Sequence, residues 1–181
     1  MINATLRSKE NIILSMASSR IVALLLKFGK TARAMFKIHV NLIETTYCSF
    51  SKHSELASLV GQTSLIIWDE AHMTHCFMIE IVDRTLRGIC DKKNMPFEGK
   101  LIAFDSDLRQ ILPVVTKASR VDIVATSLSR SDFSIDCHVM YLKINMRLRD
   151  LNLNTHEYEC WCQFEHCLLN IGNGSLLEIS L

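Results

Sequence analysis

The sequence predicts an α/β fold built on a parallel β-sheet. Short, almost wholly apolar segments alternate along the chain with segments whose apolar residues recur at helical spacing. Strands that are apolar throughout are typical of parallel sheets with helices on both faces. The 181 residues include only two prolines and six glycines, which favours continuous packed elements within one domain.

The first third of the chain supplies two of the expected strands. The expected elements are, in order, strand 11–17, helix 18–27, loop 37–54, helix 55–60 and strand 64–68. Ser18 or Ser19 is the expected N-cap of the first helix, because a serine hydroxyl satisfies a free backbone N–H. The strand 64–68 is expected to be buried on both faces, since it is apolar from Leu65 to Trp68.

The remainder of the chain continues the alternation. Apolar residues spaced by 3, 4 and 3 predict a helix with one buried face, formed by Ile79, Val82, Leu86 and Ile89. The elements expected after it are loop 91–99, buried strand 100–104, helix 121–128 and strand 138–143. A last amphipathic helix is marked by Trp161, Phe164, Leu168 and Ile171 and is expected to close at Gly172.

Composition narrows the class of protein. Hydrophobic residues make up 49% and charged residues 22% of the chain, close to the average for folded domains. The net charge of +1 means that nucleic-acid binding would need local basic patches. The apolar run Ile21–Leu26 is too short for a membrane span, and we expect no membrane partner. Seven scattered cysteines favour a reducing compartment over secretion.

Two adjacent carboxylates follow the strand 64–68. A parallel strand delivers the residues at its C-terminal end to the crevice where α/β proteins bind ligands. Asp69 and Glu70 stand at that position, in LIIWDEAHM. Asp69 is suited to position Mg²⁺, which prefers oxygen ligands, and Glu70 to orient or deprotonate a water that attacks a nucleotide. The alternative is a solvated acidic turn.

Two later strand ends carry polar residues that fit the same chemistry. Gln110 follows the strand 100–104 and is suited to hydrogen-bond a γ-phosphate or the attacking water. Arg147 follows the strand 138–143, and its guanidinium offers a bidentate fork to phosphate oxygens. The alternative for each of these side chains, taken alone, is a solvated polar residue of a loop. Their order on successive strand ends supports a shared nucleotide site.

These segments resemble the PIF-type (petite integration frequency) DNA helicases of superfamily 1B, in the branch associated with Helitron elements. LIIWDEA with FMIEIVDRTLRGI resembles the family's second motif and the helix after it. MPFEGKLIAFDSDLRQILPVV resembles the third motif and LKINMRL the fourth. The segment SKENIILSMASSRIVALLLKFGKTARAMFKI resembles the region of motif Ia. The resemblance covers about Leu6 to Gly174 and implies a RecA-like P-loop NTPase motor domain.

The resemblance implies the same roles for the site residues and adds DNA contacts. Asp69 would hold Mg²⁺, Glu70 would act on the water, Gln110 would contact the γ-phosphate of ATP, and Arg147 would complete the site. Single-stranded DNA, or a junction with duplex, would lie near Ser18, Ser19 and Phe36. Serine hydroxyls at a helix N-terminus suit a phosphate, and an aromatic ring suits a base. The alternative for Phe36 is a core position.

The sequence departs from the family pattern at three places. His72 replaces a proline, and Asp105-Ser106 replaces a glycine pair before Asp107. Arg33 and Ala34 replace a His-Ser pair before Phe36, the residue for which the resemblance implies a DNA contact.

The glycine-rich phosphate loop expected of this family is not found in the sequence. Phe28-Gly29-Lys30-Thr31 looks like the end of such a loop, but Leu24 stands where its first glycine belongs, inside an apolar helical run. By the family pattern the loop and the first strand would precede residue 1, and the second motor domain would follow residue 181. Residues 1–181 are therefore expected to be a partial first motor domain with motifs Ia, II, III and IV.

The expected parent activity is ATP-dependent 5′-to-3′ DNA unwinding in repair, recombination and telomere maintenance, with the nucleus or else the mitochondrion as location. The alternative is a truncated, non-catalytic remnant that binds DNA or a partner weakly.

A third hypothesis is a zinc site made by His156, Cys160, Cys162, His166 and Cys167. The crowded spacing lacks paired C-x₂-C knuckles, and Cys160 and Cys162 would point apart on a helix. The oligomeric state is not predicted.

Overall fold

The computed structural model describes residues 2–40, 42–43, 45–90, 95–107, 109–149 and 155–175. The chain divides into two compact units, Met1–Asp136 (unit 1) and Cys137–Leu181 (unit 2). Unit 1 contains every strand of the described sheet, and unit 2 contains the helices α7 (Met146–Arg149) and α8 (Thr155–Asn173).

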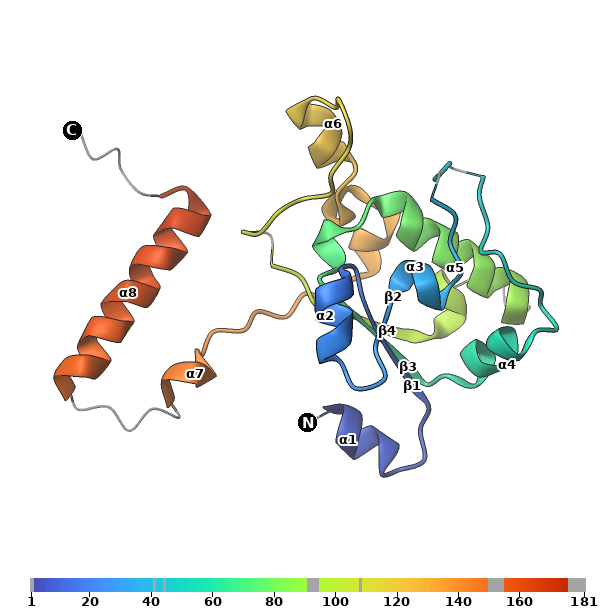
Figure 1. The fold of residues 1–181 in the computed structure, drawn as a ribbon, viewed down its shortest axis with the longest axis horizontal. Helices are drawn as coiled ribbons and strands as arrows, with labels where there is room; N and C mark the ends of the chain where they lie inside the picture. The colour runs from blue at the N-terminus through green and yellow to red at the C-terminus, as the bar shows by residue number, and fades with distance from the viewer. Residues whose placement is uncertain are drawn as a thin grey trace. The chain divides into compact units, whose positions relative to one another are not determined.

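Unit 1 is built on a parallel sheet, which confirms the predicted fold class. Its strands are β1 (Ile13–Ala17), β2 (Lys30–Thr31), β3 (Leu65–Asp69) and β4 (Leu101–Phe104). The strand order is β2-β1-β3-β4, and all neighbouring strands are parallel (Figure 1). Ala17 is paired with Asp69 and Trp68 with Phe104, so the C-terminal ends of β1, β3 and β4 lie level. The polar residues that follow these three strands therefore meet at one edge of the sheet.

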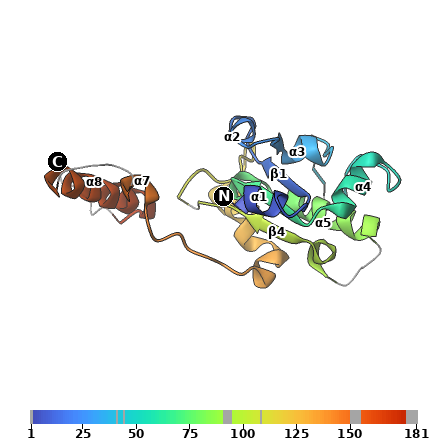
Figure 2. The same cartoon turned by 90° about the horizontal axis from the view of Figure 1, so that it is seen from below.

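Unit 1 also contains α-helices, and the second view labels α1 to α5 near the sheet (Figure 2). They are α1 (Ile2–Arg7), α2 (Arg20–Leu25), α3 (Ala32–Met35), α4 (Glu55–Gln62), α5 (Cys76–Cys90) and α6 (Arg120–Ala125). Short 3₁₀ turns lie at Ala71–Met73, Pro96–Gly99, Leu128–Arg130 and Asp132–Asp136. Serine hydroxyls cap α2, α4 and α6 by accepting a backbone N–H from the first turn, at Ser19, Ser54 and Ser119.

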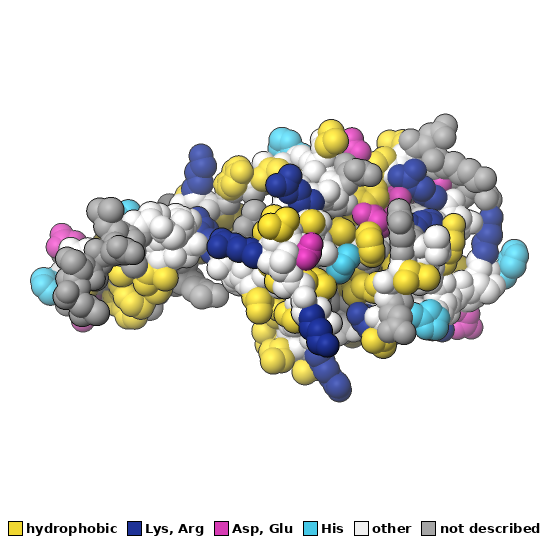
Figure 3. Space-filling model, turned by 90° about the horizontal axis from the view of Figure 1, so that it is seen from above, with side chains coloured by type: hydrophobic (Ala, Val, Ile, Leu, Met, Phe, Trp, Pro, Cys, Tyr) yellow, Lys and Arg dark blue, Asp and Glu magenta, His cyan; other side chains and the backbone are white. Residues whose placement is uncertain are grey.

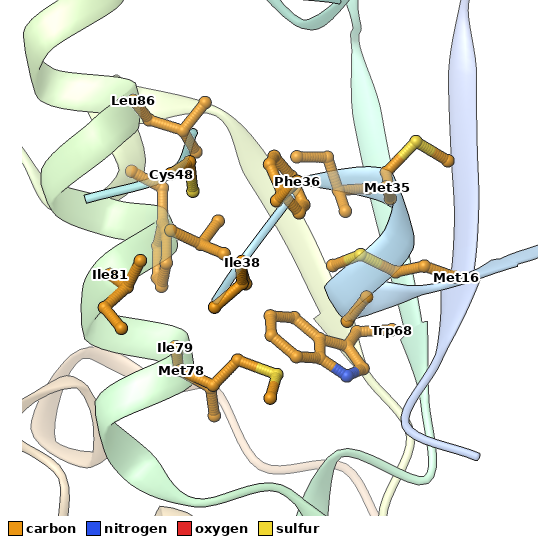
Figure 4. Packing of buried hydrophobic residues seen from close by; sticks show 14 of the residues in the cluster. Met16, Met35, Phe36, Ile38, Cys48, Trp68, Met78, Ile79, Ile81 and Leu86 are labelled. Carbon is orange, nitrogen blue, oxygen red and sulfur yellow. The ribbon is translucent and has the colours of Figure 1, made fainter. Parts of the chain in front are cut away.

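The core lies between α5 and one face of the sheet. Alternate residues of β1 and β3 point to this face, and Met16 and Trp68 are paired neighbours there with no exposed surface. Figure 4 shows Trp68 between Met16 and the side chains of α5. Three residues of the predicted helical face, Ile79, Val82 and Leu86, are also completely buried, and the fourth, Ile89, is half-buried. The sheet end that carries the polar residues is thus fixed to a packed interior.

Two of the predicted strands differ from the structure. The strand 100–104 is present as β4, but it is the edge strand of the described sheet, and Leu101 is 65% exposed. Residues 138–143 form no strand, and their apolar side chains are exposed, Leu142 almost completely. An apolar alternation predicts a strand only where a neighbouring strand accepts its backbone hydrogen bonds. No strand of the described sheet pairs with this segment.

The last helix, α8, extends beyond the predicted stop. Gly172 lies inside the helix, and Gly174 adopts the left-handed conformation, with φ 68°. Gly174 N–H donates to the carbonyl of Ile171 and Ser175 N–H to that of Asn170. This pair of bonds is the Schellman arrangement, which requires a residue that tolerates positive φ immediately after the helix. Gly174, and not Gly172, therefore ends α8.

Replacing Leu101 with lysine is expected to reduce aggregation without loss of stability. Leu101 presents an apolar side chain on the edge of the described sheet, and exposed edges pair readily with other chains unless charge protects them. The free energy of unfolding should change by no more than about 0.5 kcal/mol. Light scattering against protein concentration measures the effect. Ile102→Lys is the matched control and should unfold unit 1, because Ile102 packs against the core.

Candidate active site

Backbone hydrogen bonds join the ends of β1, β3 and β4. Ser18 N–H donates to the carbonyl of Asp69 at 3.0 Å. On the other side of β3, Asp105 N–H donates to the carbonyl of Trp68, and Ala71 N–H donates to the carbonyl of Asp105, both at 2.9 Å. The sequence-predicted Ser18 and Asp69 are therefore held beside one another, with Asp105 next along the edge.

The Asp69 carboxylate lies in an environment that disfavours its charge. Burial raises the pKa of Asp69 above its usual value of 3.8, and the negative charge of Asp105 raises it further. A divalent cation between these carboxylates would relieve both effects. Mg²⁺ in nucleotide sites is held by one or two carboxylates together with waters and phosphate oxygens, so the pair fits that ion. Asp69 and Asp105 are thus the residues that would hold Mg²⁺.

Glu70 has a left-handed backbone conformation, with φ 56° and ψ 37°. This conformation is unfavourable for a residue with a side chain and marks positions that the surrounding structure determines. The side chain is only 22% exposed, and its Oε2 lies 3.6 Å from Nε2 of His72. The strand end therefore directs Asp69 and Glu70 differently: Asp69 lies beside Asp105, while Glu70 points toward a buried imidazole.

Gln110 lies on a turn that is attached to the same edge. Its N–H donates to the carbonyl of Asp107 at 3.0 Å, and the N–H of Asp107 donates to Nδ1 of His72 at 3.3 Å. The Gln110 side chain is exposed. The structure thus brings Gln110 into the same cluster of loops as Asp69 and Glu70. His72 connects them, and in the sequence it stands out only as a departure from a family pattern.

The predicted DNA contacts are only partly consistent with the structure. The Ser18 hydroxyl accepts a hydrogen bond from Trp68 Nε1 at 3.1 Å and pairs with the hydroxyl of Thr74, so its bonds are internal. Ser19 caps α2 by accepting from Val22 N–H, which leaves its own hydroxyl hydrogen available to a phosphate. Phe36 is completely buried, so its ring has no free face for a base. The structure places Phe36 in the core and corrects that prediction.

Arg147 and Lys30 are two further residues that the sequence brings into consideration. Arg147 belongs to α7 in unit 2, its side chain is outside the described part, and its role stays a prediction. Lys30 lies in β2, paired with Met16, and not on a phosphate loop. Among the described residues, no three His, Cys, Asp or Glu side chains are placed to hold a metal ion, and no helix is long and apolar enough to cross a membrane.

Positive side chains gather around a cavity of about 450 Å³ on unit 1. Arg7, Lys30 and Lys37 line it together with the exposed ring of Phe28, and the Arg7 guanidinium lies 5.3 Å from the centre of that ring. No acidic side chain is among its lining residues in the described part of the chain. Figure 3 shows Lys and Arg side chains at several separate places on the surface. The cavity supplies local positive charge of the kind that a nearly neutral chain needs to bind phosphates.

The substitution Asp69→Asn is expected to stabilise the protein at neutral pH. The raised pKa of Asp69 means that its ionised form is penalised in the folded state. The penalty is fully present above the folded pKa and disappears below the unfolded value of about 3.8. Asp69→Asn should therefore raise the Tm at pH 7 and leave it unchanged near pH 3. Thermal unfolding followed by circular dichroism across this range measures the difference.

Asp122→Asn is the control, and its effect on the Tm at neutral pH should be opposite to that of Asp69→Asn. The Ser119 hydroxyl donates to the Asp122 carboxylate and lowers its pKa. Removing that charge should decrease the Tm at neutral pH, and the loss should vanish as the pH falls through the lowered pKa. Equal effects of the two substitutions at pH 7 would contradict the environment described for Asp69.

The parallel sheet and the acidic cluster at its C-terminal edge define an α/β protein with the architecture of a RecA-like motor domain. The sequence pattern of the PIF1-like helicases matches residues 1–180, and the chain belongs to this family. A search of curated proteins found no match.

Solved structures of Pif1 helicases share this fold. Pif1 helicase from Bacteroides in complex with ADP-AlF3 and single-stranded DNA is 25% identical, with a TM-score of 0.66, and the match covers 91% of this chain and 37% of that one. Bacteroides sp. Pif1 in complex with ADP-AlF4 is 23% identical, with a TM-score of 0.69, over 98% and 40% of the two chains. Pif1 helicase from Candida albicans is 17% identical, with a TM-score of 0.62, over 82% and 35%. The present chain therefore spans less than half the length of each of these structures.

Proposed function

We propose that this chain is part of the first motor domain of an ATP-dependent DNA helicase, of the branch associated with Helitron elements. The observation that carries the proposal is the cluster at the ends of β3 and β4. Asp69 and Asp105 lie together there, Glu70 is directed by a left-handed backbone, and the turn with Gln110 is attached beside them. Nucleotide hydrolysis requires a metal-binding carboxylate, a group that acts on water and a group that senses phosphate.

Each residue has a distinct task in this proposal. Asp69 and Asp105 would hold Mg²⁺, which neutralises phosphate charge and orients the oxygens of ATP when bound. Glu70 accepts a proton from the attacking water, and Gln110 hydrogen-bonds the water or the γ-phosphate. Arg147 supplies positive charge to the transferred phosphoryl group. The hydroxyl of Ser19 contacts the DNA backbone.

The relatives support nucleotide and DNA as ligands. One solved Pif1 structure contains both ADP-AlF3 and single-stranded DNA, and another concerns DNA unwinding at forked double-stranded DNA by two coordinating Pif1 helicases. We extend these ligands to the present chain as a proposal, and with them 5′-to-3′ movement and roles in repair, recombination and telomere maintenance. We propose the nucleus as its location.

The test is hydrolysis of ATP by the purified chain with and without single-stranded DNA. Turnover that DNA stimulates and that EDTA abolishes would support the proposal, because Asp69 and Asp105 need a cation to bind phosphate oxygens. Fluorescence anisotropy of a labelled single strand measures binding in parallel, and the affinity should fall as salt rises. Binding without hydrolysis from folded protein would instead support the non-catalytic remnant. A forked duplex with a 5′ or a 3′ tail then tests the direction of movement.

A further inference from the structure

We propose that His72 is a positioning residue that couples Glu70 to the turn carrying Gln110. The coupling rests on the proposed function only in so far as Glu70 and Gln110 are the reacting groups. The geometry itself needs no nucleotide, so it is tested separately.

The first half of the coupling is a hydrogen bond to the turn. Asp107 N–H donates to Nδ1 of His72 at 3.3 Å, and His72 is 1% exposed. Asp107 in turn organises the residues after it, since its carbonyl accepts from Gln110 N–H and its carboxylate accepts from Arg109 N–H, both at 3.0 Å. The imidazole therefore holds the first residue of the turn on which Gln110 lies.

The second half follows from the chemistry of imidazole. A ring nitrogen that accepts a hydrogen bond carries no hydrogen, so the acceptor role of Nδ1 leaves the hydrogen of the His72 ring on Nε2. That N–H lies 3.6 Å from Glu70 Oε2. Both atoms are buried, and neither has a hydrogen-bond partner in the described part of the chain. A buried donor and a buried acceptor that face one another gain from closer approach, because each otherwise bears the cost of desolvation.

The approach needed is small. A separation of 3.6 Å is too long for a hydrogen bond, and a bond forms at about 2.7–3.2 Å, so a movement of about half an ångström suffices. A ligand that draws the Gln110 turn inward moves Asp107, and with it the imidazole, relative to Glu70. The carboxylate is then held by the same side chain that holds the turn. His72 thus makes the position of Glu70 depend on the position of Gln110.

Substitutions of His72 that preserve only one of its two contacts test the contact with Asp107 separately from the contact with Glu70. The side-chain amide of asparagine reaches the place of Nδ1 and can accept from Asp107 N–H, whereas that of glutamine reaches the place of Nε2. Leucine fills the buried volume and keeps neither. Backbone hydrogen exchange measured on the full chain by NMR gives the readout, with the tautomer read from the ¹⁵N shifts of the His72 ring.

We expect the Nε2–H tautomer in the parent chain. Exchange at Asp107 N–H should be about three- to tenfold faster in His72→Leu and His72→Gln and near the parent rate in His72→Asn. Asp105 N–H, which donates to Trp68, is the internal control and should keep its parent rate in all three. Equal acceleration at Asp105 and Asp107, or an Nδ1–H tautomer, would overturn the proposal and leave His72 a packing residue. None of these readouts requires ATP turnover.

Discussion

Replacing Trp68 with alanine is expected to cost about 3–5 kcal/mol of folding free energy, the range measured for truncation of buried aromatic residues. Trp68 has no exposed surface and lies between the sheet and α5. Its Nε1 donates to the Ser18 hydroxyl, and the centre of its ring lies 5.9 Å from the centre of the Phe104 ring. A domain of this size is stable by about 5–15 kcal/mol, so the change removes a large part of that margin. Urea unfolding followed by far-ultraviolet circular dichroism measures it.

Trp161→Ala is the matched control, since the sequence contains two tryptophans. Trp161 lies on α8 in unit 2 and is 47% exposed, so its loss should change the stability of unit 1 by no more than about 0.5 kcal/mol. In that variant the remaining fluorescence comes from Trp68 and reports the core directly. A small effect of Trp68→Ala, or an equal effect of both changes, would contradict the core described for unit 1.

The parts of the fold that could be predicted are those whose signal is local. The strands β1 and β3 each carry a mostly apolar run, and the helix α5 carries an uninterrupted helical spacing, and each is present where it was predicted. The exposure of β4 and the irregular backbone of 138–143 depend instead on which strands are neighbours. Pairing between distant strands leaves no mark within the segment itself, so an apolar pattern alone predicted a buried strand at 100–104 and a further strand at 138–143.

The candidate site divides in a similar way. Asp69 and Gln110 could be placed from the sequence, because residues after parallel strands meet at one edge. The burial of Phe36 could not, since an aromatic residue beside basic ones suits a DNA contact and a core position equally well. The role of His72 could not be predicted either, because it sits between Ala71 and Met73, where a buried polar side chain has no sequence signature. Only the position of Asp107, 35 residues later, shows that Nδ1 of His72 accepts a hydrogen bond from the Asp107 N–H.

The substitution Glu70→Gln is expected to lower the rate of ATP hydrolysis by about 10²–10⁴-fold, the usual contribution of a general base. Glutamine has the size and shape of glutamate, so the left-handed backbone and the contact with His72 are retained while the charge and the proton acceptor are lost. Binding of ATP should persist, because the carboxylates assigned to the metal are Asp69 and Asp105. A fall in kcat with little change in KM is the pattern of a group that acts in the transition state.

Glu55→Gln provides the comparison, since Glu55 is an exposed residue in the first turn of α4, remote in sequence from the cluster, and should leave turnover unchanged. Steady-state kinetics of the parent and both variants, in the presence of single-stranded DNA and Mg²⁺, decide the matter. Equal turnover in the parent and in Glu70→Gln would exclude Glu70 as the base, whatever the rate. A rise in KM without a fall in kcat would assign Glu70 to binding rather than to the chemical step. A selective loss of kcat would place the proton transfer at the end of β3, where burial, backbone strain and His72 together direct this carboxylate.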